Sequence, residues 1–296
     1  MKKFWMVLLI LAVVGIVLMA CGFSLGAYTN LSLDRNGLNY GGAEKMIDVN
    51  ETNIGQITEI DIDMAAANVE IIPGPDYGYE IHSTRNNPIT HKFENGKLTI
   101  SQNLSFSWRL FSFNFDFSHD SVKIYLPPEA FMQNVSVRTA SGKIYLSSMN
   151  CDRFNLSSSS GKIDAKDVTA TDFSANCTSG KVSLDSVKAD RFNLVLTSGQ
   201  LTANNINSGT LSATLTSGSA KLSGQFLGST NISMTSGSVN MDIDGKREDY
   251  RTSASTVSGS VRVNGEKLND QDRNSSAPYS LNVDVISGGV RINYAR

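Results

Sequence analysis

The chain has 296 residues, enough for one large domain or two ordinary ones. Its 26 basic and 28 acidic side chains leave a net charge of −2, which argues against a nucleic-acid binder. Three cysteines and three histidines cannot supply a disulfide scaffold or a His-rich metal site, and 40% hydrophobic residues are too many for a disordered chain. The 39 Ser, 26 Asn and 19 Thr instead predict a folded protein with a polar, mostly uncharged surface.

Residues 1–28 predict a membrane anchor or a signal segment. Lys2 and Lys3 precede an apolar stretch from Phe4 to about Tyr28, which as a helix would span the ~30 Å hydrocarbon core of a bilayer. Lysines before this stretch, with no comparable basic cluster just after it, place the N-terminus in the cytoplasm. We therefore expect a single-pass protein of the cytoplasmic membrane whose C-terminal domain is extracellular.

Two cleavable alternatives stay open for this segment. Leu18-Met19-Ala20-Cys21 resembles a bacterial lipoprotein cleavage box, in which Cys21 would be lipidated and the preceding residues removed. An ordinary signal peptide would also be cleaved. Apolar residues continue past Cys21, where lipoproteins usually turn polar, and this favours the uncleaved anchor. Each alternative places the rest of the chain outside the cytoplasmic membrane.

The segment between the anchor and the repeats is less regular. Residues 29–52 predict a tether, and residues 53–138 predict irregular N-terminal β coils and a cap. Alternating apolar residues predict three strands in this part, at 59–72, 77–82 and 97–101. Asn95-Gly96 is a typical hairpin turn and is expected between strands.

Six aromatic residues crowd into twelve positions of this irregular half and make up a quarter of the 24 aromatics in the chain. They are Phe106, Trp108, Phe111, Phe113, Phe115 and Phe117. One interpretation is an exposed patch that binds a sugar, a partner or a membrane surface. The favoured one is a strand pair that caps the open end of the repeats, whose core would otherwise meet water. The segment is also the best candidate in the sequence for an interaction site.

The strongest feature of the chain is an internal repeat. A Ser-Gly dipeptide recurs at intervals of 19 residues, at Ser141, Ser160, Ser179, Ser198, Ser217 and Ser236. It returns at Ser258 and Ser287 after spacings of 22 and 29, and we expect polar loops that bulge from single coils to explain these longer intervals. VKIYL at 122–126 echoes KIYL at 143–146, which predicts a degenerate coil without Ser-Gly.

Each 19-residue unit contains two short stretches in which apolar and polar residues alternate. The apolar positions of one unit are Val182, Leu184, Phe192, Leu194 and Leu196. This period of two marks strands with one buried face, and no helical stripe of useful length occurs in the units. The predicted fold is all-β: a single-stranded, right-handed parallel β-solenoid (β-helix) with 19-residue coils over residues 139–296, preceded by one N-terminal transmembrane helix.

Stacking the units in register produces columns of equivalent residues. Glycine at every Ser-Gly suits a corner with positive φ. Arg153, Asp172 and Arg191 share one column, so that opposite charges meet in adjacent coils. A column of like charge is formed by Lys143, Lys162 and Lys181. We expect that last column to be solvated, because like charges across a ladder are unfavourable.

The chain resembles a bacterial family of β-strand-repeat proteins named "putative adhesin", which includes LiaG-like envelope-stress proteins. The resemblance rests on a hydrophobic N-terminal stretch followed by AAANVEIIPG at 65–74, VKIYLP at 122–127 and repeated TSGKV-type units, and it covers roughly residues 45–296. It implies the repeat fold and supplies no catalytic residues. Cys21 within the anchor and the aromatic segment depart from the family pattern.

Catalytic chemistry finds little support in the residues. The carboxylates of the repeats scatter over different columns, and the repeats contain no histidine. His82, His91 and His119 lie in the irregular half without the spacing of metal ligands. Cys177 is expected to be buried and out of register with Cys151, so that no disulfide joins them. We expect no enzymatic activity, no cofactor and no metal.

The expected function is that of a non-enzymatic extracytoplasmic cell-envelope protein, an adhesin-like or scaffold solenoid. Its repeated polar faces suit weak multivalent contacts. The expected partners are the membrane, through the N-terminal helix, and an envelope glycan or a membrane protein, but no nucleic acid. One alternative is a regulatory component of envelope-stress signalling. The least supported alternative is a polysaccharide-active β-helix enzyme.

Overall fold

The structure is a computed structural model of the chain, and it describes residues 30–34, 37–40, 46–84, 89–102, 111–114, 120–267 and 276–295. These residues fall into two compact units, which are considered separately. Among the described residues, no helix is long and apolar enough to cross a membrane. The predicted anchor at 1–28 lies outside the described residues and stays a prediction.

The smaller unit contains a three-stranded antiparallel sheet in the order β2-β1-β8. Its strands are β1 (Asn30–Asp34), β2 (Gly37–Tyr40) and β8 (Phe111–Asn114). Leu33 of β1 lies opposite Leu38 of β2 on one side and Phe111 of β8 on the other. Part of the segment predicted as a tether therefore pairs with part of the aromatic segment.

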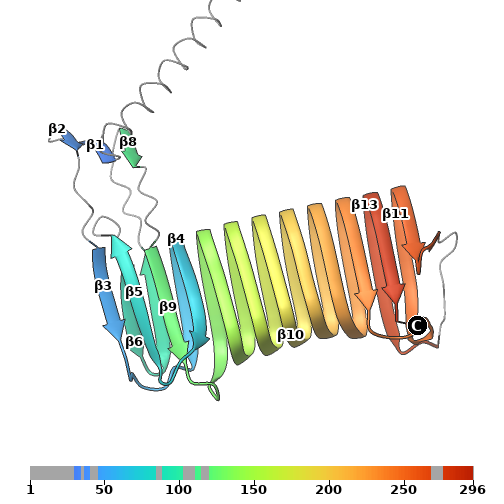
Figure 1. Ribbon diagram of the computed structural model, residues 1–296, viewed down its shortest axis with the longest axis horizontal. Coiled ribbons are helices and arrows are strands. Elements are labelled where there is room, and N and C mark those ends of the chain that lie inside the picture. Colours follow the sequence, from blue (N-terminus) through green and yellow to red (C-terminus); the bar gives the residue numbers. More distant parts are fainter. Residues whose placement is uncertain are drawn as a thin grey trace, which may run out of the picture. The chain divides into compact units, whose positions relative to one another are not determined.

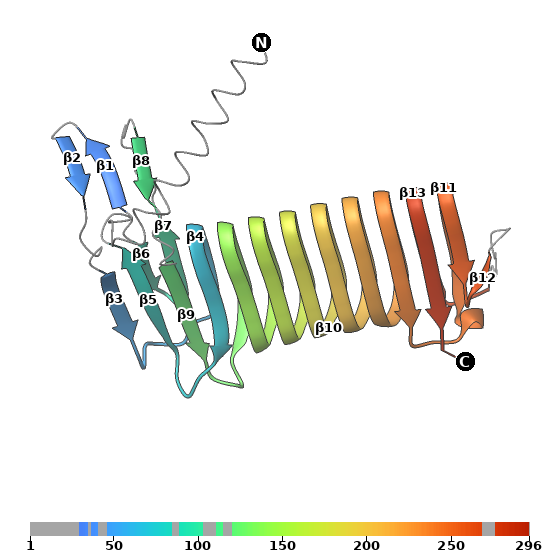
Figure 2. The same ribbon diagram turned by 45° about the horizontal axis from the view of Figure 1, so that its top comes forward.

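The larger unit is a stack of β coils (Figures 1 and 2). Its strands are β3 (Met46–Glu51), β4 (Glu59–Pro73), β5 (Gly78–Thr84), β6 (Ile89–Glu94), β7 (Lys97–Gln102), β9 (Asp120–Leu126), β10 (Phe131–Ile243), β11 (Tyr250–Val263), β12 (Glu266–Lys267) and β13 (Tyr279–Tyr294). Apart from one 3-10 turn, η1 (Arg247–Asp249), every regular element among the described residues is a strand. The predicted all-β class is confirmed.

The coils run parallel to one another. β4 pairs with β10, and β10 and β11 each pair with β13, all in parallel register. Within β10, a single strand of 113 residues that winds around the axis, contacts recur between residues 19 apart. The Phe154, Phe173 and Phe192 rings stack in this way, with centroids 5.7 and 5.6 Å apart. The 19-residue spacing is therefore a structural period, while the predicted handedness stays a prediction.

The Ser-Gly corners are positions where neighbouring coils approach too closely for any side chain. Seven of the eight Ser-Gly glycines have positive φ, and Gly161 is the exception. A Cβ added to Gly180 would lie 1.9 Å from the carbonyl oxygen of Gly161, and one added to Gly199 would lie 2.0 Å from that of Gly180. Glycine is therefore required here both by the backbone conformation and by the contact between coils.

A second corner in four successive coils uses side chains that tolerate the left-handed conformation. Its residues have φ between 51° and 55° and are Ser148, Asp167, Ser186 and Asn205. Ser, Asp and Asn suit such positions because their short polar side chains can bond the local backbone. The sequence analysis missed this corner, although its residues also recur every 19 positions.

Two outward faces of the coils are important below. The lysine face follows the Ser-Gly corner and includes residues 143–147, 162–166 and 181–185. The arginine face precedes the next Ser-Gly corner and includes residues 153–157, 172–176 and 191–195. In both faces every second residue points outward while its neighbours are buried, as the alternating pattern predicts.

The coils do not stack in sequence order at the C-terminal end. β13, the last coil of the chain, lies between β10 and β11, as Figure 1 shows. The amides of Asn264 and Ala295 donate to the carbonyl oxygens of Ile292 and Ile243, respectively. The expectation that residues near 245–251 and 264–280 bulge from single coils is wrong. Residues near 245–251 lead from β10 to β11, which are not neighbours, and residues near 264–280 return from β11 to β13, which lies between the two. The spacings of 22 and 29 between Ser-Gly pairs reflect this exchange.

The N-terminal end of the stack shows the same exchange. β4 lies between β9 and β10, although β9 directly precedes β10 in the chain (Figure 2). Ile71 of β4 aligns with Ile124 on one side and with Leu146 on the other. The coil predicted at VKIYL is therefore present and contains β9. Its register is shifted by two residues relative to KIYL at 143–146, and β4 lies between the two segments. Beyond β9, the antiparallel strands β5 and β3 complete the sheet.

The three strands predicted in this half are confirmed as β4, β5 and β7. β6 and β7 form an antiparallel hairpin around the turn at Asn95 (φ 50°) and Gly96 (φ 78°), as predicted. Positive φ at both central residues is the conformation for which Asn-Gly is suited.

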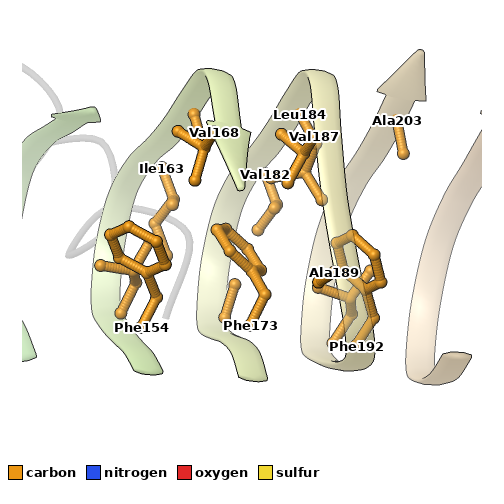
Figure 3. Close-up of a cluster of buried hydrophobic side chains, with 14 of the residues drawn as sticks. Phe154, Ile163, Val168, Phe173, Val182, Leu184, Val187, Ala189, Phe192 and Ala203 are labelled. Atoms are coloured by element: carbon orange, nitrogen blue, oxygen red, sulfur yellow. The ribbon is translucent and has the colours of Figure 1, made fainter. Parts of the chain in front are cut away.

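The core of the larger unit is a continuous apolar column inside the coils. Figure 3 shows Phe154, Phe173 and Phe192 stacked in adjacent coils. Ile163 and Val182 lie above these rings in the view and are also buried. At the C-terminal end, three tyrosines pack together, and the Tyr250 ring lies 5.3 Å from both Tyr279 and Tyr294. Cys151 and Cys177 are buried and free, so the prediction of a buried Cys177 without a disulfide is confirmed.

Candidate functional site

The predicted interaction segment is described only in part. Phe111 and Phe113 lie on β8, whose backbone pairs with β1. Phe106, Trp108, Phe115 and Phe117 lie outside the described residues, and so does Cys21. Both interpretations of the aromatic segment, exposed patch and cap, stay predictions.

The place where this segment leaves the larger unit is well defined. β7 pairs with the first part of β4, and β9 pairs with its last part. Residues 103–119 therefore connect β7 to β9 at the level where β4 continues around its corner without an interruption. The Gln102 side-chain oxygen accepts from the amides of Ala65 and Ala66, at 3.2 and 3.4 Å. Its amide nitrogen donates to Oδ2 of Asp120 at 2.5 Å, which joins the two ends of the insertion.

The candidate site is a pair of open depressions on and beside the arginine face, which share Arg153. One, of about 560 Å³, runs over the phenylalanine stack; its outward-pointing wall residues include Arg153, Asn155, Asp172, Arg191 and Asn193. The other, of about 550 Å³, continues toward β4; its lining includes Gln56, Glu59, Phe131, Gln133, Asn134 and Asp152. Together they form a groove that follows the stacking direction, because equivalent residues of successive coils line it. Its floor over the phenylalanine stack is mostly apolar, and polar side chains stand along its walls.

One pair of charges in this groove is fixed. The Arg191 guanidinium donates two hydrogen bonds to Asp172, one of them from Nη2 to Oδ2 at 2.7 Å. These bonds hold the pKa of the Asp172 carboxyl below its usual value. The predicted meeting of opposite charges in adjacent coils is thus confirmed for these two residues.

Arg153 differs from Arg191. No carboxylate among the described residues forms a salt bridge with its guanidinium, although Asp172 lies in the next coil of the same column. An unpaired guanidinium between two depressions offers five N–H donors to a carbonyl, hydroxyl or anionic oxygen of a ligand. Arg153 is therefore the residue of the groove that is best placed to bind something other than the protein itself.

Phe131 and a row of amides complete the site. Phe131 is 52% exposed, an unusual state for a phenylalanine, and it lines the same depression as Arg153. An exposed ring can pack against the apolar face of a sugar, while amides and hydroxyls bond its hydroxyl groups. The amides and hydroxyls beside the phenylalanine stack form one column: Asn155, Ser174, Asn193 and Ser212. Sequence reasoning missed this column, which aligning the units would have revealed.

The described residues offer little for catalysis. No group of three His, Cys, Asp or Glu that could hold a metal ion occurs among them. Burial raises the pKa of the Cys151 thiol to about 12 and also raises that of Cys177, which leaves both thiols protonated and unreactive at neutral pH. Nδ1 of His82 lies 2.6 Å from Oδ1 of Asp48 at the surface, and neither residue lines the groove.

The fold places this chain in the class of all-β proteins that are built from stacked coils and present extended polar faces. Residues 57–293 match the Toastrack DUF4097 domain, a domain of unknown function. Because this match covers more than half of the chain, the protein belongs to the Toastrack DUF4097 family. The predicted resemblance to the "putative adhesin" proteins is confirmed.

One solved structure agrees with this assignment at the level of the fold, and a second is similar over most of the chain with a lower score. A structure described as a putative adhesin from Bacteroides fragilis has 15% identity and a TM-score of 0.54, and covers 86% of this chain and 98% of its own. One described as a putative lipid binding protein from Parabacteroides distasonis has 13% identity and a TM-score of 0.45, and covers 85% and 96%. No curated protein matches the chain.

Proposed function

We propose that the chain is a non-enzymatic scaffold of the bacterial cell envelope. Residues 1–28 anchor it in the cytoplasmic membrane, and a right-handed, single-stranded solenoid presents its groove to an envelope glycan or a protein partner outside. The observation that carries the proposal is the groove itself, in which an unpaired guanidinium, an exposed aromatic ring and repeated amides line one open face.

The repeating geometry supports contact with a long partner. Equivalent polar residues recur about every 4.8 Å along the stack, the spacing of neighbouring strands. A polymer that lies along the groove would meet several equivalent weak contacts, and such contacts combine through effective concentration into useful avidity. The rigid core of stacked phenylalanines fixes their spacing.

A regulatory role in envelope-stress signalling is the second candidate. The resemblance noted in the sequence favours it, because the "putative adhesin" proteins that the chain resembles include LiaG-like envelope-stress proteins. In that case the groove would bind a membrane-protein partner rather than a glycan. The two candidates therefore differ in the partner and share the surface.

The proposal is tested by crosslinking in intact cells with purification of the full chain. Retention with cell-wall glycan supports the scaffold, whereas recovery of a sensor-kinase partner supports the regulatory role. Arg153→Ala and Phe131→Ala should each lower the yield of the crosslinked partner. Arg251→Ala is the matched control, because Arg251 occupies the same column at the far end of the stack and lies outside both depressions.

The anchor requires a separate test. If residues 1–28 form an uncleaved helix, Cys21→Ala leaves membrane association and apparent mass unchanged. Loss of a lipid label with accumulation of a heavier precursor would show instead that the chain is a lipoprotein. Turnover of an envelope glycan by the purified chain would contradict the non-enzymatic assignment.

A further inference from the structure

The lysine face carries a second feature, a stripe that begins at three consecutive Ser-Gly corners. In these coils the corner is followed directly by lysine: Ser141-Gly142-Lys143, Ser160-Gly161-Lys162 and Ser179-Gly180-Lys181. A Cβ added to Gly161 would lie 2.1 Å from the Gly142 carbonyl oxygen, and one added to Gly180 would lie 1.9 Å from that of Gly161. The corners are therefore in register, and the three lysines follow one another at about 4.8 Å per coil.

The charge of this stripe is incompletely neutralised by the protein. Asp164 is the carboxylate shared by two lysines, at 2.6 Å from Lys162 Nζ and 3.6 Å from Lys143 Nζ. No carboxylate among the described residues forms a salt bridge with Lys181. Like charges directly opposite each other on a ladder are unfavourable, so the stacking of three lysines carries a cost in stability.

On the arginine face, by contrast, basic side chains form salt bridges with carboxylates of neighbouring coils. There Arg191 pairs with Asp172, Arg138 with Asp63 at 3.4 Å, and Lys97 with Asp61 at 3.2 Å. On the lysine face, further cations recur two residues along from the lysine column, at Lys123, Lys221, Arg291 and Arg262. From β4 through β10, β13 and β11, Glu70 and Asp164 are the only acidic residues of these two columns, whereas Lys123 of β9 also faces Glu80 of β5, and Asp48 of β3 faces His82. A chain with a net charge of −2 thus concentrates unmatched positive charge on one face.

Hydroxyl donors accompany the lysines. Ser141, Ser160 and Ser179 are exposed at the corner, two residues before each lysine. Ammonium and hydroxyl groups in alternation are suitable ligands for the oxygens of phosphate or carboxylate groups. A narrow stripe of such donors along the stack fits anions that are themselves arranged in a line.

We propose that the Ser-Gly-Lys stripe, centred on Lys143, Lys162 and Lys181, is a binding site for a linear polyanion, a polymer of phosphodiester or carboxylate units that lies along the stack. A bilayer surface fits the stripe less well. The exposed large apolar side chains of the described residues are Ile47, Phe131, Val195, Leu227, Val257 and Ile286. None of them lies in the two cationic columns, so nothing in the stripe would insert among lipid chains.

The test measures binding of fluorescently labelled linear polyphosphate by the full chain, held in nanodiscs of uncharged lipid. The variant K143Q/K162Q/K181Q removes the stripe, and K188Q/K246Q/K267Q removes the same charge from exposed lysines elsewhere. We expect the stripe variant to bind roughly 10- to 100-fold more weakly and the control variant to bind like the wild type. Raising the salt concentration from about 50 to about 200 mM should weaken the wild type more than the stripe variant.

The controls separate the alternatives. Replacing Lys143 and Lys162 removes like-charge repulsion but also deprives Asp164 of its salt bridges. Binding is therefore measured at a temperature at which circular dichroism shows the stripe variant to be fully folded, so that weaker binding cannot result from unfolding. Equal losses in both triple variants, or no binding by the wild type, would overturn the proposal. Anionic vesicles that displace the probe better than unlabelled polyphosphate at equal phosphate would also overturn it and identify a membrane surface. The inference rests on the proposed envelope role for its setting, but this binding assay can fail without changing where the chain is located.

Discussion

The middle of the coil stack and its two ends follow different rules. Between Ser141 and Ile243, successive coils of β10 lie beside one another and their mutual contacts join residues about 19 apart, and only the first and last of these coils also pair with β4 and β13. At the ends, β4 and β13 are inserted one place inward, between strands that the chain order would make neighbours. Local repeats therefore determine the middle, whereas long-range pairing determines the ends.

The exchange at the C-terminal end of the stack gives β13 a partner on each side. It pairs with β10 and with β11, both in parallel register. The outer position falls to β11, which is held by connections at both of its ends and is partly covered by β12. The unpaired backbone groups of an edge strand are therefore presented by β11 and not by β13.

Deleting a whole coil from the middle is the most severe test of this difference. Removal of residues 177–195 joins Asn176 to Leu196, which enters the buried column that Cys177 leaves. We expect a folded protein, with a cost of about 1 to 3 kcal/mol for the larger side chain in addition to the loss of one coil interface. Removal of only residues 177–186 should prevent folding, because it deletes the Ser179-Gly180 corner and shifts the core out of phase.

Circular dichroism and resistance to protease of the two purified variants provide the measurement. The whole-coil deletion should give a β-type spectrum and resist the protease. The half-coil deletion should lose both properties. If both deletions were tolerated equally, or both unfolded equally, the 19-residue coil would not be the structural unit.

A single glycine substitution should sharpen the same comparison. Gly199→Ala places a Cβ 2.0 Å from the Gly180 carbonyl oxygen at φ +153°, and we expect a loss of about 3 kcal/mol or more. Gly289→Ala is the matched control beside another corner, because its Cβ would meet only the Ser260 carbonyl oxygen at 3.9 Å. Thermal unfolding should show a drop of roughly 6–12 °C for the first variant and almost none for the second. Equal drops would mean that contact between coils does not explain the glycine column.

The contrast between middle and ends also explains what the sequence could predict. The coil period, the buried columns and the Arg191–Asp172 pair follow from residues at fixed spacing, which a single sequence displays directly. The insertion of β13 leaves no such trace, because the Ser-Gly motif at Ser287 is equally compatible with either neighbour. Likewise, Phe131 alternates like any strand residue, and only the structure shows that its ring is exposed.

Removing the Arg191 ion pair should have the smallest effect. Arg191→Gln should lower the melting temperature by a few degrees at most at neutral pH, because the pair is exposed. Arg191 lowers the pKa of Asp172 in the folded state, so its stabilisation is present above the ordinary Asp pKa of about 3.9 and is lost as the pH falls through the lower folded value. The difference between variant and wild type should therefore disappear in acid. Arg251→Gln should show no such dependence on pH, and a shared dependence would contradict the assignment.

The order of the last coils is tested most directly by cysteine crosslinking. Asn231 and Asn282 are ladder partners whose side chains hydrogen-bond at 2.8 Å, and Ser253 pairs with Asn282 on its other side. Oxidation should therefore link Asn231→Cys to Asn282→Cys, and Ser253→Cys to Asn282→Cys, as peptide mass spectrometry of the full chain would detect. Asn231→Cys and Ser253→Cys should stay unlinked, because they lie two ladder steps, about 10 Å, apart. Efficient linkage of this last pair, without linkage of Asn231→Cys to Asn282→Cys, would show that the coils stack in sequence order and would contradict the exchange.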